Sequence, residues 1–342
     1  MPQALLSLQD IDYPLPPERI AYRPAPNREE SRLCVLRDGV LEHRIFRDIT
    51  DYFSPGDALI LNNTRVIPAR LFGCRKSGGQ VEVFLLEKES DHIWWVMGKP
   101  GRALRPGEVL SFNGLTGEVL SLDSENGKRR MRFSASDAVL FAAGSVPLPP
   151  YIKREADNED IHRYQTTYAR IEGSVAAPTA GLHFTPALLE RIADRGVHIG
   201  YVTHHVGLGT FKPVQEEDVS RHRMEEEYFE ISENVCDAVN RARGEGRRVF
   251  AVGTTTVRAL ESAVQQELPL CPTAGRTVLF IHPPFEFKVV TALITNFHAP
   301  RSTLLLLVSA FAGLEHIRNL YQEAIQREYR FLSYGDATLL FR

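Results

Sequence analysis

Several histidines stand where a side chain could carry out acid–base chemistry. His183 ends the loop APTAGLH just before a helix pattern, so its ring could face a cleft. His204 and His205 are adjacent on a predicted strand, where successive side chains point to opposite faces, so we expect one buried and one exposed ring and no shared metal ion. Histidine titrates close to neutral pH and suits proton transfer. A histidine in such a place more often serves as hydrogen-bonded scaffolding than as a base.

A second candidate site is an apolar strand that ends at Gly253 and runs directly into a helix pattern. The unpaired N–H groups of a helix start would suit a carboxylate or a phosphate, together with the hydroxyls of Thr254, Thr255 and Thr256 and the guanidinium of Arg258. Threonine is also a common helix cap, so the same pattern fits a purely structural turn.

Polar groups interrupt apolar runs at two further predicted strand ends. The first group is Asn62, Asn63, Thr64 and Arg65, and the second is Asn296 and His298. Ligands collect at the ends of strands in α/β sheets, which makes these side chains candidates for binding. Asparagine-rich turns are equally common without a ligand.

The segment HVGLGTF contains Gly207 and Gly209. It lacks the third glycine and the following helix of a dinucleotide fingerprint. We interpret it only as backbone that another group approaches closely.

Basic residues gather around two turns of a β-rich stretch and just after it. They are Arg102, Arg105, Lys128, Arg129, Arg130, Arg132, Lys153 and Arg154. The formal net charge of −3 is not that of a typical nucleic-acid binder, so any RNA contact must come from such local patches. A solvated surface explains these residues as well.

The sequence pattern changes along the chain, and with it the type of secondary structure expected to position these groups. Prolines between residues 14 and 26 exclude a regular helix and indicate an extended arm. Residues 67–148 show short alternating apolar segments separated by glycine turns, which is typical of antiparallel hairpins in a small barrel or sandwich. Later segments alternate between strand and helix patterns, with strands predicted at 198–206, 247–253, 277–281 and 288–297 and helices at 186–196, 232–246, 254–267, 301–313 and 313–331.

This alternation predicts an α/β layer architecture. The simplest topology builds one α/β catalytic domain from residues 1–66 and 149–342 and inserts a β-barrel domain, residues 67–148, into it. Three independent parts remain an alternative.

Composition excludes several classes of protein. With 342 residues, of which 43% are hydrophobic and 24% charged, the chain has an ordinary globular composition. The N-terminus lacks the pattern of a signal peptide, and the longest apolar stretch, 304–311, is far shorter than the roughly 20 residues of a membrane span. Four cysteines without a C-x-x-C pair are expected to be small buried hydrophobes. We therefore expect a cytoplasmic protein without a membrane segment and without a bound metal. Because the sequence shows no coiled-coil heptad, we also expect a monomer.

Taken together and in order, the segments resemble a known family. They are YPLPPERIAYRPAPNREESRL, NNTRVIPARL, PTAGLHFT, HVGLGTFKPV, GTTTVRALES, FEFKVVTALITNFHAPRSTLLLLVSAFAG and YRFLSYGDATLL. The family is that of the S-adenosylmethionine:tRNA ribosyltransferase-isomerases of queuosine biosynthesis, and the resemblance covers essentially the whole chain.

The resemblance implies a β-barrel attached to a larger α/β domain, which agrees with the organisation above. It also implies that S-adenosylmethionine is consumed as a ribosyl donor, with release of adenine and methionine and no further cofactor. The implied acceptor is 7-aminomethyl-7-deazaguanine (preQ1) at the wobble position of tRNA, and the product is epoxyqueuosine. One departure is Glu225, which stands where the family pattern often has a histidine.

This chemistry assigns hypothetical roles to the candidate residues. A base near the sulfonium-activated ribose 5′ carbon could generate an ylide, and we nominate His183 and His205 first, then Glu227 and His298. The helix start at Thr254–Thr256, with Arg258, is the candidate for the methionine carboxylate. The remaining candidate substrate contacts are Asn62, Asn63, Thr64, Arg65, Thr179, Gly207, Gly209 and Asn296. For tRNA we favour the basic residues named above.

Two rival functions remain open from the sequence. A methyltransferase would use the same donor but keep the ribose intact, and its usual strand with a glycine-rich loop near the start of the α/β domain is not found. A non-catalytic RNA-binding module is a second alternative, although the β-rich stretch lacks the closely spaced aromatics of a stacking platform.

Overall fold

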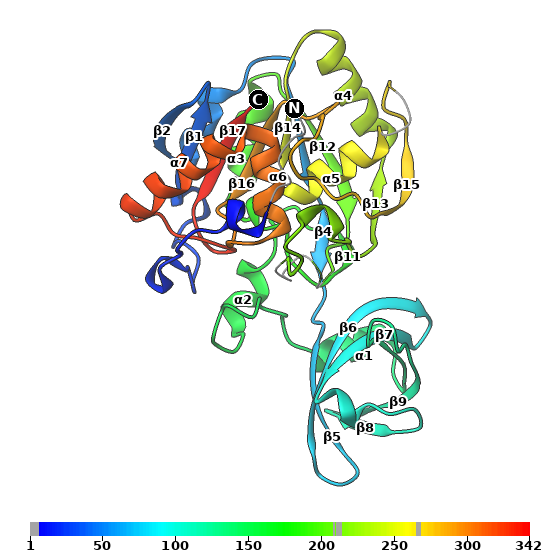
Figure 1. Cartoon of the computed structure of the whole chain (residues 1–342). Helices are drawn as coiled ribbons and strands as arrows, with labels where there is room; N and C mark the ends of the chain where they lie inside the picture. The colour runs from blue at the N-terminus through cyan, green and yellow to red at the C-terminus, as the bar shows by residue number, and fades with distance from the viewer. Residues whose placement is uncertain (1–6, 208, 210–213, 265–267) are drawn as a thin grey trace.

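The structure, a computed structural model, describes residues 7–207, 209, 214–264 and 268–342. Figure 1 shows a larger lobe built on a sheet and, attached to it, a separate β-barrel. The strands of the large sheet are β1 (Arg32–Arg37), β2 (Val40–Ile45), β3 (Ala58–Asn62), β12 (His198–His204), β13 (Glu227–Ile231), β14 (Val249–Val252), β15 (Thr273–Thr277), β16 (Ala292–Asn296) and β17 (Ala337–Phe341).

The large sheet combines strands from both ends of the chain, in the order β15-β13-β12-β3-β14-β16-β17-β1-β2. Its centre, β12-β3-β14-β16, is parallel, and β13, β15, β17 and β2 each join a neighbour antiparallel. Every residue of β3, β14 and β16 is buried, as expected for parallel strands covered on both faces. The predicted insertion of the β-rich stretch into an α/β unit is thereby confirmed as the fold.

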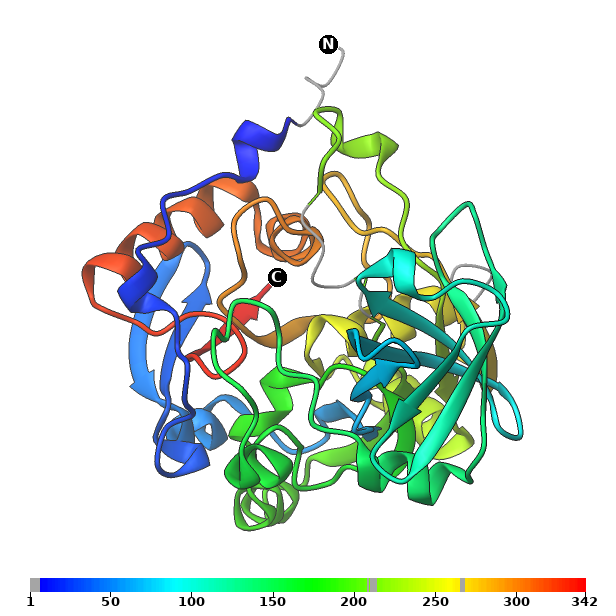
Figure 2. The ribbon, with the colours of Figure 1, turned by 90° about the horizontal axis from the view of Figure 1, so that it is seen from below.

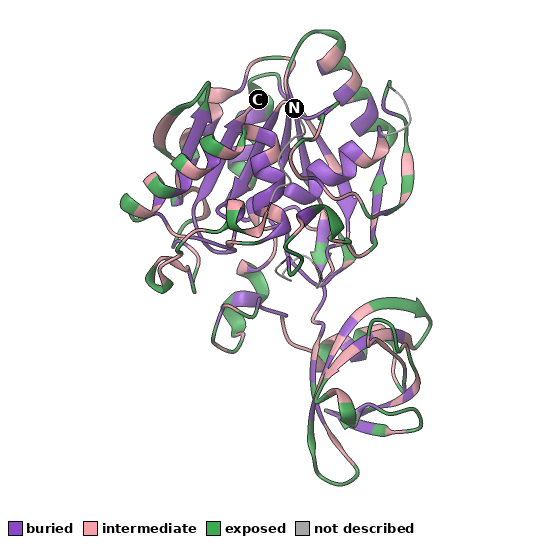
Figure 3. Ribbon diagram, in the orientation of Figure 1, coloured by how far each residue is buried: buried purple, intermediate pink, exposed green. Residues whose placement is uncertain are grey.

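Helices cover both faces of this sheet. One face packs against α4 (Glu233–Gly244), α5 (Thr254–Ala263), α6 (Thr303–Ala312) and α7 (Leu314–Gln326), and the other against α3 (Pro186–Asp194) and the 3-10 segment η4 (Phe46–Tyr52). Strand β3 shows the alternation, since Ile60 joins the first core while Leu59 and Leu61 join the second. Figure 3 shows the sheet and its inner helix faces as one buried layer.

Local sequence explains where these helices begin. Thr185 caps α3 by accepting a hydrogen bond from the Leu188 N–H (3.1 Å), and Pro186 takes the first helical position. Ser302 caps α6 in the same way through the Leu305 N–H (3.1 Å). Helix α6 is apolar on nearly every side because it lies between the sheet and α7.

The barrel is a closed, six-stranded antiparallel structure with the order β10-β7-β6-β5-β8-β9. Its strands are β5 (Arg70–Arg75), β6 (Gln80–Ser90), β7 (Ile93–Lys99), β8 (Val109–Phe112), β9 (Leu115–Leu122) and β10 (Arg129–Phe133), and α1 (Asp137–Ala143) follows them. The inward residues form a core of their own, which includes Leu71, Val83, Val96 and Val119. The predicted barrel is therefore confirmed.

Short elements connect the two lobes and form the N-terminal arm. The two-stranded sheet of β4 (Thr64–Val66) and β11 (Ile171–Ser174) lies in the body beside the barrel, and α2 (Asn158–Arg163) follows the barrel in the chain. From residue 7 onward the helical turns of the arm are of the 3-10 type, η1 (Leu8–Ile11), η2 (Pro17–Arg19) and η3 (Arg28–Glu30). In Figure 2 the arm runs beside α7, on the side of the body away from the barrel. No helix of the described ranges is long and apolar enough to cross a membrane.

Three local predictions were wrong. The strand predicted at 277–281 ends at Thr277, because Phe280 and Ile281 pack on the helix-covered core instead of extending the edge of the sheet. The helix predicted at 313–331 ends at Gln326, and Tyr329 and Phe331 enter the core beyond it. Cys271 is exposed rather than buried.

Candidate functional site

Four parallel strands end at one edge of the sheet. Strand β3 ends at Asn62, β12 at His204, β14 immediately before Gly253, and β16 at Asn296. Since neighbouring parallel strands run in the same direction, their carboxyl ends form one contiguous edge. The structure thus brings together four groups that lie far apart in the sequence.

Asn62 ties this edge together and is fully buried. Its Nδ2 donates hydrogen bonds to the His204 carbonyl oxygen (2.9 Å) and to Thr255 Oγ1 (3.2 Å). Its Oδ1 accepts from the N–H groups of His204 and Thr64 (both 3.1 Å). Because both amide hydrogens and the amide oxygen are bonded within the protein, Asn62 positions β3, β12 and α5 relative to one another.

Glu227, at the start of β13, is the centre of a buried charge network. One carboxylate oxygen, Oε2, accepts from His204 Nε2 (2.9 Å) and from Arg258 Nη1, and the other, Oε1, accepts from the Gly207 N–H (2.9 Å). Burial alone would raise the pKa of Glu227, but the His204 hydrogen bond and the charge of Arg258 lower it to about 2. An ionised carboxylate held in this way fixes the His204–Gly207 segment, and it is a poor general base.

His205 lies on the other side of the same segment, just beyond the end of β12. Its Nδ1 is 2.8 Å from Thr64 Oγ1, and its ring stacks on Tyr228 with centroids 5.6 Å apart. Burial, followed by the neighbouring His204, lowers the pKa of His205 to about 4, so the ring is neutral at pH 7. The prediction of opposite faces is confirmed, with His204 fully buried and His205 partly exposed.

Gly173 allows the His205 ring its position. A Cβ atom on Gly173 would lie 2.7 Å from His205 Nε2, and the φ angle of this glycine is +145°. Both facts favour glycine, since a side chain would strain the backbone and displace the imidazole.

Two cavities flank the His204–Gly207 segment, and Val206 lines both. The first, the strand-edge cavity of about 110 Å³, is lined by Thr179, Thr254, Thr255, Asn296 and His298, among others. The second, the interlobe cleft of about 370 Å³, lies between the body and the barrel. The body contributes Gly173, His205, Gly207, Glu227 and Tyr228 to this cleft, and the barrel side contributes Lys88, Trp94 and Asp137.

His298 faces the strand-edge cavity from the loop after β16. Its Nε2 lies 3.0 Å from Thr295 Oγ1, and its N–H donates to Tyr321 Oη (2.9 Å). Burial lowers the pKa of His298 to about 3, so this ring is also neutral.

His183 lies in a different environment, at the end of the 3-10 segment η6 (Thr179–His183). Its Nδ1 is 2.7 Å from Ser31 Oγ, and its Nε2 has no hydrogen-bond partner among the residues described. Burial, with the charge of Arg330, lowers the pKa of His183 to about 3, while the side chain of Asn296 opposes this shift. His183 therefore belongs to a neighbouring pocket that approaches the strand-edge cavity at Asn296.

Some of the remaining candidate side chains are hydrogen-bonded within the protein, and others are exposed. Thr256 Oγ1 donates to the Val252 carbonyl (2.7 Å), Asn63 Oδ1 accepts from Thr203 Oγ1 (2.8 Å), and Arg258 Nε donates to the Leu279 carbonyl (2.9 Å). Arg65 is exposed, 3.9 Å from Glu172. A Cβ atom on Gly209 would lie 3.1 Å from the Glu225 side chain, which agrees with the expected close approach.

Most of the predicted RNA-binding cations have carboxylate or carbonyl partners. Lys128 pairs with Glu225 (3.3 Å), Arg130 with Glu89 (2.5 Å), Arg132 with Glu118 (3.6 Å) and Arg154 with the buried Asp160 (2.5 Å). Arg129 donates to the Gly101 carbonyl (2.9 Å). In contrast, Arg102, Arg105 and Lys153 are exposed, and no ion pair joins them to any residue of the described ranges. Glu225, the departure from the family pattern, thus pairs with a cation of the barrel.

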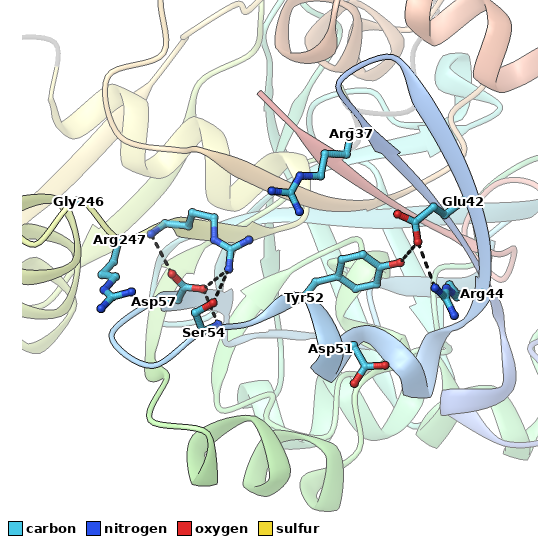
Figure 4. A pocket seen from close by; sticks show the side chains of 10 residues that line it. Arg37, Glu42, Arg44, Asp51, Tyr52, Ser54, Asp57, Gly246 and Arg247 are labelled. Carbon is cyan, nitrogen blue, oxygen red and sulfur yellow. Dashed lines mark hydrogen bonds and ion pairs between the residues drawn. The ribbon is translucent and has the colours of Figure 1, made fainter.

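A further pocket of about 600 Å³ lies at the opposite edge of the sheet, near the starts of β3 and β14. Figure 4 shows that several of its charged groups neutralise one another. Arg248 bonds Asp57 (2.9 Å) and Ser54 (3.1 Å), while Glu42 accepts from Tyr52 (2.8 Å) and Arg44 (3.3 Å). We therefore place the candidate site at the carboxyl edge.

His204 was considered from the sequence together with His205 but was not nominated for a role. Its adjacency to His205 was the available signal, but the partner that gives it a role, Glu227, is 23 residues away in the chain. Within the described parts of the chain, no three histidine, cysteine, aspartate or glutamate side chains form a group that could hold a metal ion.

The fold and the cavities define an α/β protein with a candidate ligand site at its strand ends and a barrel across a cleft from that site. The family described as "Queuosine biosynthesis protein" matches residues 8–340, and the chain belongs to this family.

Similar proteins cover the whole chain. An S-adenosylmethionine:tRNA ribosyltransferase-isomerase of Thermotoga maritima is 47% identical, over 98% of this chain and 100% of the relative. One of the same name from Carboxydothermus hydrogenoformans is 49% identical with the same coverage. The crystal structure of the S-adenosylmethionine tRNA ribosyltransferase of Thermotoga maritima aligns with 38% identity and a TM-score of 0.56, over 97% of this chain and 100% of that one.

Proposed function

We propose that this chain is an S-adenosylmethionine:tRNA ribosyltransferase-isomerase of queuosine biosynthesis. It transfers and isomerises the ribosyl part of S-adenosylmethionine onto preQ1 at the tRNA wobble position, and releases adenine and methionine. The observation that carries the proposal is the pair of cavities that meet at Val206, because the reaction has two substrates that must contact each other.

The strand-edge cavity suits the donor and the interlobe cleft suits the acceptor base. Drug-sized ligands occupy pockets of about 300–1,000 Å³, so the cleft of about 370 Å³ has room for a nucleobase. The strand-edge cavity of about 110 Å³ is smaller than the donor, which must extend beyond it. The donor's ribose would then extend past Val206 into the interlobe cleft, where it meets the acceptor base and His205.

His205 is the base that this arrangement favours. It is neutral at pH 7, its Nδ1 is bonded to Thr64, and the ring lines the interlobe cleft. A neutral imidazole can accept the proton lost from the ribose 5′ carbon next to the sulfonium. The neutral aminomethyl nitrogen of preQ1 forms a bond to the ribosyl part and loses a proton. Adenine leaves with the electrons of its glycosidic bond and takes up a proton, and methionine leaves as the neutral thioether with the electrons of its bond to the 5′ carbon.

Glu227, nominated from sequence as a catalytic residue, becomes a positioning residue in this proposal. Together with Arg258 it fixes His204 and the Gly207 N–H, and thereby the backbone that carries His205. His298 stays a candidate donor contact, since it lines the strand-edge cavity. His183 contributes through the neighbouring pocket rather than at the reacting carbon.

Alanine at position 205 tests the base assignment. Equal losses in kcat and kcat/KM would support a transition-state role for His205, whereas a change confined to KM would refute it. His43, on β2 of the body, is the matched control, because its Nδ1 bonds only Tyr329 Oη (2.8 Å), away from both cavities.

The tRNA surface is proposed on the exposed cations. Arg102, Arg105 and Lys153 are the first candidates, and the paired residues Lys128, Arg129, Arg130, Arg132 and Arg154 could contribute only after exchanging their partners. Replacing a contacted cation by glutamine should lower the slope of log affinity against log salt by about 1. An unchanged slope for all three exposed residues would exclude this surface.

We further propose a cytoplasmic monomer that requires no cofactor beyond the consumed donor. Residues 1–66 with 149–342 would form the catalytic domain and residues 67–148 the inserted barrel domain. The support is that the strands of the closed barrel lie between Arg70 and Phe133, whereas the large sheet takes its strands from either side of this range.

The decisive experiment incubates the purified protein with S-adenosylmethionine and preQ1-containing tRNA. Mass spectrometry should find adenine, methionine and epoxyqueuosine. S-adenosylhomocysteine would identify a methyltransferase instead, and tRNA binding with an intact donor would identify a binding module.

A further inference from the structure

Three arginines from distant parts of the chain line one small pocket beside the strand-edge cavity. They are Arg28 of the N-terminal arm, Arg163 at the end of α2, and Arg330 after α7. Ser31, His183, Ser333 and Tyr334 are its other polar lining residues, and the cavity volume is about 20 Å³. We call this site the arginine pocket.

The positive charge of the arginine pocket is only weakly balanced. Arg28 has no carboxylate within 4.0 Å in the described part of the chain, and Arg163 lies 3.5 Å from the exposed Glu159. The Arg330 guanidinium lies 3.8 Å from the Asp336 carboxylate. The two carboxylate oxygens of Asp336 already accept hydrogen bonds from the backbone N–H groups of Arg32 (2.9 Å) and Arg330 (2.8 Å). Burial, and next the charge of Arg163, lowers the pKa of Arg28.

Backbone carbonyls hold the guanidiniums in place and leave part of their capacity unused. Arg28 donates to the carbonyls of Leu182 and His162 (both 2.9 Å), Arg163 to those of Ala25 (2.5 Å) and Pro26 (3.2 Å), and Arg330 to that of Arg23 (3.2 Å). A guanidinium has five N–H donors. Over the described residues, Arg163 Nε is buried without a partner. Such a convergence of donors and uncompensated positive charge is the chemistry of an oxyanion site.

The arginine pocket adjoins the strand-edge cavity. Ser333 lines both, and the segment from Pro178 to His183 passes from one to the other. Asn296, at the end of β16, lines the strand-edge cavity. Its side chain also acts to raise the pKa of His183, which lines the arginine pocket. A ligand too large for the strand-edge cavity can therefore extend past Ser333 toward the arginines.

We propose that the arginine pocket binds the carboxylate of the methionine part of S-adenosylmethionine. This inference rests on the proposed function, which supplies the donor. A planar carboxylate matches the fork of a guanidinium and suits a cavity of about 20 Å³, whereas an RNA backbone phosphate is tetrahedral and bulkier. The helix start at Gly253 is the alternative position, but the Thr256 hydroxyl there already donates to the Val252 carbonyl, and among the described residues the site offers no guanidinium fork facing the strand-edge cavity.

The test combines a change in the protein with a change in the ligand. Calorimetry would measure the binding of S-adenosylmethionine and of 5′-methylthioadenosine, which lacks the amino-acid part, to the wild type and to Arg330→Gln. We expect Arg330→Gln to weaken S-adenosylmethionine binding by about 10- to 100-fold, the range of a charged hydrogen bond. Binding of methylthioadenosine should change by less than about twofold.

Arg247→Gln is the matched control, because Arg247 is exposed at the opposite edge of the sheet (Figure 4). It should leave both affinities unchanged. If Arg330→Gln weakened the binding of S-adenosylmethionine and of methylthioadenosine equally, Arg330 would have a merely structural role and the proposal would be overturned. The proposal would also be overturned if Thr255→Val, and not Arg330→Gln, weakened the binding of S-adenosylmethionine. It would likewise be overturned if Arg330→Gln flattened the salt dependence of tRNA binding and left the affinity for S-adenosylmethionine unchanged.

The two proposals fail in different ways. A wild-type protein that binds S-adenosylmethionine through Arg330 but releases no adenine would contradict the proposed function and leave the arginine pocket standing. If the protein catalysed ribosyl transfer and its affinity for S-adenosylmethionine did not depend on Arg330, the arginine-pocket proposal would be contradicted and the proposed function would stand.

Discussion

Replacing Glu227 with glutamine should destabilise the α/β body by about 3–5 kcal/mol, the usual cost of breaking a buried ion pair from one side. Both side chains of the Glu227–Arg258 pair are only 4% exposed. The substitution leaves the Arg258 charge buried without its counter-ion, and it weakens the bonds from His204 Nε2 and the Gly207 N–H. The large value follows from this uncompensated charge.

Urea denaturation followed by circular dichroism measures this effect. Glu230→Gln is the matched control, since Glu230 lies on the same strand, is exposed, and bonds only the Tyr228 hydroxyl (3.1 Å). A surface change of this kind should stay within about 0.5 kcal/mol of the wild type. If Glu227→Gln and Glu230→Gln unfolded at the same urea concentration, the charge network would not stabilise the body.

The destabilisation should also depend on pH. The pKa of Glu227 is lowered from 4.5 to about 2, so its stabilising contribution is fully present above pH 4.5 and is lost as the pH falls toward 2. The difference in unfolding free energy between the wild type and Glu227→Gln should therefore shrink across this window. A difference that stays constant from pH 6 to pH 3 would contradict the assigned ionisation.

Three further predictions use other parts of the structure. Gly173→Ala should lower kcat by about 100-fold because its Cβ atom displaces the His205 ring, whereas Gly275→Ala, with no atom within 4 Å of its Cβ, should have no effect; equal activities would refute the close approach. Asn62→Asp should cost about 1–3 kcal/mol for each buried acceptor that loses its donor, measured by urea denaturation against the wild type. The exposed Cys271 should react first with a thiol reagent and Cys34 last, because burial raises the pKa of the Cys34 thiol to about 12; peptide mapping of the modified protein decides this.

Much of the fold could be predicted because its signals are local. The switch from alternating apolar segments to strand–helix alternation marked the barrel and its insertion, since side-chain period and glycine turns reflect short-range geometry. Boundaries were wrong where packing overruled the local pattern, as at Phe280, which joins the core without extending a strand.

The candidate site could be predicted only as a set of segments. The sequence indicated that polar groups follow strands, and parallel pairing placed them at one edge. It could not indicate that Glu227 bonds Arg258, 31 residues away, or that most of the basic hairpin is neutralised by carboxylates of other strands.

The sequence by itself therefore determined the family, the inserted barrel and the segments that carry the site. The tertiary structure alone decided which side chains meet: His205 at the cleft, His204 with Glu227, and His183 in the arginine pocket with Arg330. The physical reason is range. Element formation depends on residues a few positions apart, whereas charge pairing and pocket formation depend on strand order and packing between distant segments.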